Sequence, residues 1–132
     1  MTRSDADRPR ALSPDLVETS LSVIRAGQAP SGALTAGPTF SQYGFSWFRD
    51  GSFIAEALSM AGEIESADRF HRWVARIVLA SVQGIERARA AGRAGRVPDE
   101  ADYLHCRYSA DGEPSRDDGW FSFQLDGPGI WL

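Results

Sequence analysis

The sequence predicts an all-α fold, and three observations support this prediction. Apolar residues recur at the period of a helix in three segments, at residues 14–26, 48–61 and 64–91. Gly27 and Gly62 follow the first two segments, where a glycine commonly ends a helix. Only one stretch, residues 103–108, is typical of a strand.

Composition restricts the class of protein. A chain of 132 residues suggests one domain at most, and a net charge of −4 does not favour nucleic acid or an anionic membrane. A single cysteine, Cys106, excludes an internal disulfide and is compatible with a reducing compartment. No apolar run approaches the roughly 20 residues that span a bilayer, and no secretory signal is visible. We therefore expect a cytoplasmic protein with neither membrane nor nucleic-acid partners.

The first helix has clear start signals. Residues 1–12 are polar and are predicted to form a disordered tail ahead of a folded part, residues 13–132. Ser13 can cap the helix, Pro14 suits its first position, and Asp15 suits the positive end of its dipole.

A long loop and a buried helix follow. Residues 28–46 are rich in Gly, Pro, Ser and Thr but contain several aromatic side chains, so a functional loop is favoured. The segment 48–61 is apolar or small almost all round, which is typical of a buried helix. Phe53 is expected in its core.

The third segment, from about residue 64 or 66 to 91, predicts one long amphipathic helix. Its apolar stripe, which includes Trp73 as a core residue, alternates with charged side chains. Residues 92–119 are expected to be irregular apart from 103–108, and Pro128 precedes what looks like the first turn of a further apolar helix.

One stretch combines charge and aromatic rings in an unusual way. Residues 42–53, with the sequence QYGFSWFRDGSF, place an Arg49–Asp50 pair directly against several rings. A core would accept the rings and exclude the charges, while an ordinary surface would do the reverse. A pocket for a polar ligand with flat apolar faces requires both.

Three motifs, in order along residues 28–132, resemble the glucoamylase-type glycoside hydrolases of family 15. They are SGALTAGPTFSQYGFSWFRDGSF, FHRW at 70–73, and GWFSFQLDGPG at 119–129. The resemblance implies an (α/α)6 barrel, in which inner and outer helices alternate. The buried helix followed by an amphipathic one agrees with that order. The chain would then form a partial barrel.

The resemblance also implies roles for the first of these motifs. Tyr43 matches a tyrosine beneath the terminal sugar, and Trp47 matches a tryptophan that lines the same pocket. Arg49 and Asp50 match the pair that holds the glucose hydroxyls. These roles suit a pyranose, because rings can stack on its C–H face while charged groups bind its hydroxyl edges.

The third motif carries the remaining candidates. By resemblance, Trp120 helps to position the catalytic acid and the substrate, while Gln124 and Asp126 lie on the pocket wall. The family more often has a glycine directly after this tryptophan, whereas Phe121 stands here. The family's two catalytic glutamates lie downstream of this motif, and this chain stops at residue 132. No catalytic residue is therefore assigned, and the chain is predicted to be a truncated part, inactive alone.

Simpler alternatives stand beside these assignments. Arg49–Asp50 can be a structural ion pair near a helix start, and Trp47 and Trp120 can be core residues. Neither the histidines nor the acidic turns have the spacing of a metal site. No metal or cofactor is expected.

The functional hypothesis is a fragment of an inverting, exo-acting hydrolase that releases glucose from the non-reducing end of α-glucosides. Trehalose hydrolysis by the same type of fold is one alternative. A non-catalytic module for sugar sensing or protein interaction is another, as is a helical interaction protein without a sugar site. The isolated chain is expected to self-associate, because an unclosed ring of helices leaves apolar faces exposed.

Overall fold

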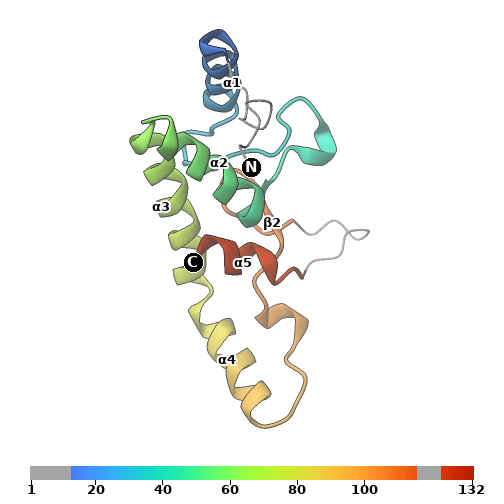
Figure 1. Cartoon of the computed structure of the whole chain (residues 1–132). Helices are drawn as coiled ribbons and strands as arrows, with labels where there is room; N and C mark the ends of the chain where they lie inside the picture. Colours follow the sequence, from blue (N-terminus) through green and yellow to red (C-terminus); the bar gives the residue numbers. More distant parts are fainter. Residues whose placement is uncertain (1–12, 116–122) are drawn as a thin grey trace, which may run out of the picture.

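The computed structural model describes residues 13–115 and 123–132 (Figure 1). The predicted disordered tail, residues 1–12, and Trp120 lie outside the described residues. The described part is mainly helical, as predicted, and it also contains one short antiparallel ladder, whose first strand was not predicted. The elements in order are α1 (Pro14–Ala26), η2 (Ser41–Tyr43), β1 (Ser46–Trp47), α2 (Phe48–Met60), α3 (Ile64–Ala80), α4 (Val82–Arg93), η3 (Glu100–Asp102), β2 (Arg107–Tyr108) and α5 (Asp126–Trp131).

Local signals set the bounds of α1. The backbone N–H of Leu16 donates to Ser13 Oγ at 3.3 Å, Pro14 is the first helical residue, and Gly27 is the C-terminal cap. This confirms the predicted start and end. No residue of α1 is fully buried, and the helix lies at one end of the molecule (Figure 1).

The core forms where α2 packs against α3, and aromatic rings fill it. Gly51 makes the close approach possible, because a Cβ at this position would lie 2.3 Å from Cε2 and Cζ of Phe70. The ring of Phe70 stacks on Trp73, and Phe48 stacks on Tyr108 of β2 with ring centroids 5.1 Å apart. Trp73 is thus a core residue, as predicted.

The prediction that α2 is buried all round is wrong, and so is the assignment of Phe53 to the core. Phe53 is 61% exposed and Met60 is 82% exposed. The helix packs on α3 and α5, and its buried residues are Phe48, Gly51, Ser52, Ala55 and Leu58. Phe53 lies two positions from Gly51, about 200° around the helix, and therefore points away from both partners.

The segment predicted as one long helix is two helices. The chain leaves α-helical geometry at Ser81, whose φ and ψ are −94° and 1°, and its hydroxyl donates to the carbonyl of Ile77 at 2.9 Å. Helix α4 continues beyond the break and packs on η3, where Arg87 pairs with Asp102 at 2.6 Å. Gly84 in the first turn of α4 also faces η3, since a Cβ there would lie 3.3 Å from the carbonyl oxygen of Asp102.

The segment 28–46 is an ordered loop rather than a structureless one. Gln28 and Leu34 form an isolated antiparallel bridge. Further along, the N–H of Ala36 donates to the carbonyl of Phe45 at 3.0 Å, and that of Gly37 donates to Tyr43 at 2.9 Å. The loop therefore delivers its last residues to β1 in a fixed position.

The strand predicted at 103–108 is shorter than expected. Only β2, residues 107–108, pairs with β1, with Ser46 opposite Tyr108 and Trp47 opposite Arg107. This ladder ties the start of α2 to a segment about 60 residues further along the chain.

None of the described helices combines the length and apolar character required to cross a membrane.

Candidate functional site

The candidate site lies at the N-terminus of α2, directly after the β1–β2 ladder. Trp47 is the last residue of β1 and also the N-terminal cap of α2, so the ladder fixes where the helix begins. Arg49 and Asp50 therefore stand in the first turn of α2. Their side chains are each 38% exposed.

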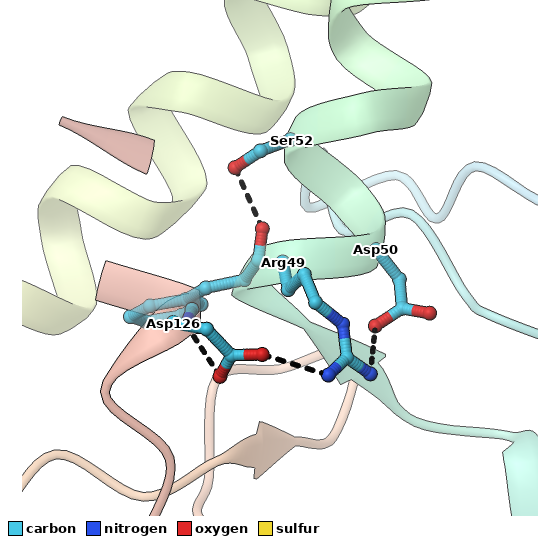
Figure 2. A network of polar contacts seen from close by, with 6 residues as sticks. Arg49, Asp50, Ser52 and Asp126 are labelled. Atoms are coloured by element: carbon cyan, nitrogen blue, oxygen red, sulfur yellow. Dashed lines mark hydrogen bonds and ion pairs between the residues drawn. The ribbon is translucent and has the colours of Figure 1, made fainter. Parts of the chain in front are cut away.

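Arg49 connects two carboxylates, one from the next residue in the sequence and one from a helix far along the chain. Its Nη2 lies 3.2 Å from Oδ2 of Asp50, and its Nη1 lies 2.9 Å from Oδ2 of Asp126 (Figure 2). The second pair joins α2 to α5, across 77 residues of sequence. The Arg49 guanidinium thus binds one carboxylate through each of its two terminal nitrogens.

The short helix α5 places Asp126 by packing closely on α2. Gly127 is buried, and a Cβ at this position would lie 3.5 Å from Cβ of Phe48. The backbone N–H of Gly127 donates to Oδ1 of Asp126 at 3.0 Å. One oxygen of Asp126 is therefore held by its own helix and the other by Arg49.

The charges in this cluster stabilise one another. Arg49 lowers the pKa of Asp126, chiefly through the hydrogen bond between them. The pKa of Arg49 is raised, first by that hydrogen bond and then by the charge of Asp50. With one guanidinium and two carboxylates, the cluster carries a net negative charge and offers exposed acceptor oxygens. Such a group suits a neutral ligand that has several hydroxyl donors.

Three rings, Tyr43, Phe45 and Trp47, lie just before the charged cluster in the sequence and together form an aromatic wall. The centroids of Tyr43 and Trp47 are 6.3 Å apart at 41°, and those of Phe45 and Trp47 are 6.4 Å apart at 88°. Tyr43 is 47% exposed, whereas Trp47 is only 4% exposed. Tyr43 can therefore offer a ring face to a ligand, and the burial of Trp47 suits both a pocket wall and the alternative of a core residue.

The structure brings most of the predicted site residues into two adjoining groups. Arg49, Asp50 and Asp126 contact one another, and Tyr43 contacts Trp47. Gln124 is half-buried in the approach to α5.

Sequence reasoning missed Arg107, which is 2% exposed. Its Cζ lies 4.7 Å from the ring centroid of Phe45 and 6.0 Å from that of Trp47. The one available signal was an arginine inside a segment with the pattern of a strand. This signal is weak, because the sequence does not show which residues the arginine contacts.

His105 and Cys106 lie directly before Arg107 and are shielded from solvent. His105 is half-buried, with Nδ1 3.0 Å from the carbonyl oxygen of Arg107, and desolvation is the main cause of its lowered pKa. Burial likewise raises the pKa of the Cys106 thiol, so a reactive thiolate is not favoured. Within residues 13–115 and 123–132, no three His, Cys, Asp or Glu side chains gather in a way that could hold a metal ion.

Comparison with known proteins finds the family model described as glycosyl hydrolases family 15, which matches residues 16–132. The isomaltose glucohydrolase of Kribbella flavida is 41% identical over 119 residues, which is 89% of this chain and 31% of that protein. A solved wild-type glycosidase superposes with a TM-score of 0.80 at 41% identity. A variant glycosidase solved in complex with glucose superposes equally well.

These relatives confirm the predicted fold class, an all-α, partial (α/α)6 glycosidase barrel. The match to the solved glycosidases covers 89% of this chain and 32% of theirs. The chain thus spans about a third of the length of the relatives it matches.

Proposed function

Since the chain belongs to glycosyl hydrolases family 15, we propose that it forms the part of a glycoside hydrolase that holds the terminal glucose of an α-glucoside. The observation that carries this proposal is the charged cluster at the start of α2. Arg49 lies between two half-exposed carboxylates and follows Trp47 by two residues, and Trp47 in turn contacts the exposed ring of Tyr43.

The chemistry of a pyranose fits this arrangement. Asp50 accepts hydrogen bonds from sugar hydroxyls, while Arg49 donates to hydroxyl oxygens from a rigid, planar group. Tyr43 stacks on the C–H face of the ring. Charge-assisted hydrogen bonds of this kind contribute about 1.5–3 kcal/mol each.

Isomaltose is the first substrate to test, because the curated relative is an isomaltose glucohydrolase. Maltodextrin and trehalose are the alternatives, since each also presents a terminal α-linked glucose. Hydrolysis in the complete enzyme would proceed with inversion, which requires an acid and a base with room for a water between them. Asp50 and Asp126 do not suit these roles, because both are held by the same guanidinium. The chain alone is therefore expected to be inactive.

The decisive experiment places residues 13–132 into the isomaltose glucohydrolase of K. flavida, in place of its matching segment. In this chimera, Asp50→Ala should lower kcat/KM for isomaltose by about two to four decades, since roughly two charge-assisted hydrogen bonds are lost. Asp68→Ala is a matched control, because Asp68 is an exposed carboxylate 2.8 Å from Arg72 on α3, outside the site. The control should retain its activity.

A melting curve of the same variants separates this proposal from the structural alternative. Asp50 is 38% exposed and Arg49 keeps its pair with Asp126, so the loss of Asp50 should cost under about 1 kcal/mol of stability. Normal kinetics with a large loss of stability would instead show that Arg49–Asp50 is only a structural ion pair. Glucose release by the 132-residue chain alone that depends on Asp50 would show that it contains the catalytic groups.

A further inference from the structure

We propose that Arg107 is a positioning residue, which holds the aromatic wall in the orientation needed to bind sugar. This inference rests on the proposed function, because it assigns a role to a residue behind the same site. Arg107 itself is 2% exposed, so any effect on a ligand is transmitted through the rings that it contacts.

The backbone fixes Arg107 opposite the wall. Arg107 on β2 pairs with Trp47 on β1 in the antiparallel ladder. On its other side, the carbonyl of Arg107 accepts a hydrogen bond from the N–H of Ser115 at 3.2 Å. Arg107 therefore belongs to a segment that is held from both sides, and its side chain starts from a defined place.

The guanidinium meets two rings of the wall at once. Its Cζ lies 4.7 Å from the centroid of Phe45, well within the range of a cation–π contact, and 6.0 Å from that of Trp47, at the limit of that range. Phe45 and Trp47 lie nearly perpendicular to each other, at 88°. A planar guanidinium can contact both rings only in a narrow range of orientations, so these contacts also restrict the tilt of the two rings.

Arg49 and Arg107 therefore have different roles. Arg49 is 38% exposed and binds two carboxylates, so it can meet a ligand directly. Arg107 is buried behind the wall, and Trp47 connects it to the exposed ring of Tyr43. Loss of the guanidinium would allow Phe45 and Trp47 to change their tilt, and Tyr43 would follow.

The first test needs no activity. In the NMR spectrum of the 132-residue chain, the Arg107 δ protons should show an upfield ring-current shift, because the guanidinium lies over the Phe45 ring. Phe45→Leu should remove most of that shift. Arg107 δ protons at their ordinary position in the wild-type chain would overturn the inference, whatever the function of the protein.

The second test uses the chimera with the isomaltose glucohydrolase. Arg107→Met should raise KM for isomaltose by about 3- to 30-fold with kcat little changed, since the wall contacts substrate and transition state alike. Arg107→Lys keeps the charge and should restore part of the affinity. Phe45→Leu should raise KM similarly, and the effect of adding Arg107→Met to it should be smaller than that of Arg107→Met alone, because the contact with Phe45 is already lost while that with Trp47 remains.

Ile77→Ala controls for loss of stability, because Ile77 is a buried residue of α3 that packs near Gly112, away from the wall. It should lower the melting temperature without changing KM.

The role of Arg107 would be refuted if KM is unchanged in both Arg107→Met and Phe45→Leu while Asp50→Ala still disables the chimera. The proposed function would then still stand. If Asp50→Ala has no effect, the proposed function fails instead. Should Arg107→Met not fold, Phe45→Leu and Arg107→Lys carry the test.

Discussion

Gly51→Ala tests the close packing of α2 on α3, on which the geometry of the site depends. The added methyl would lie 2.3 Å from two carbons of the Phe70 ring. That is about 1.2 Å short of the roughly 3.5 Å at which two carbon atoms attract best. Phe70 has 0% exposure and stacks on Trp73, which is 2% exposed, so the ring has no free space to enter.

The expected result is a loss of stability of about 1–2 kcal/mol. Overpacking of a core costs about 1–3 kcal/mol, with this contact in the upper half of that range, while alanine gains about 1 kcal/mol over glycine within a helix. Urea unfolding of the chain at low micromolar concentration, followed by tryptophan fluorescence, measures the difference. The midpoint should fall by roughly 0.5–1.5 M.

Gly92→Ala is the matched control, since Gly92 lies in α4 and a Cβ there would meet nothing within 4 Å. It should leave stability unchanged or raise it by up to about 1 kcal/mol. If Gly51→Ala is as stable as the wild type while Gly92→Ala behaves as expected, α2 and α3 do not pack as described.

Three further predictions concern the isolated chain. Light scattering should show self-association, because Phe53 and Met60 form an exposed apolar face, and Met60→Lys should reduce it; a monodisperse wild-type monomer would contradict this. Because the pKa of His105 is lowered in the folded chain, the unfolded chain takes up the proton of this side chain at a higher pH, so the free energy of unfolding should fall as the pH drops below 6.5. Urea titrations at several pH values should show a weaker pH dependence for His105→Gln. Burial raises the pKa of Tyr108 to about 12, so the stabilisation of the fold by the neutral Tyr108 side chain should be complete below pH 10 and lost as the pH rises through 12. An absorbance titration in which all three tyrosines of the folded chain ionise near pH 10 would exclude this.

Local chemistry made part of the fold predictable. Ser13, Pro14 and Gly27 act within a few residues of the helix ends that they determine, so the predicted bounds of α1 were correct at both ends. The break at Ser81 was not predicted, because neither glycine nor proline stands at Ser81 itself and the packing of α4 on η3 involves residues further along the chain. The exposure of Phe53 likewise depends on which faces of α2 have partners, and a helical pattern alone does not show this.

The site residues also differ in how far the sequence alone could predict them. Arg49 and Asp50 are adjacent in the sequence, and their unusual aromatic neighbours drew attention to them. Asp126 was included only through the resemblance to family 15, and the structure then placed it 2.9 Å from Arg49. Arg107 was missed because its partners lie about 60 residues away, and no local pattern identifies a buried guanidinium.

The distance along the chain between Arg49 and Asp126 has a consequence for synthesis on the ribosome. The two residues are 77 positions apart, so at 5–20 residues per second Asp126 is made about 4–15 s after Arg49. Helices α2 and α3 are complete by Ala80 and can pair during that interval. The contact between α2 and α3 can therefore form before Asp126 is made, and the charged cluster can be completed only once α5 follows.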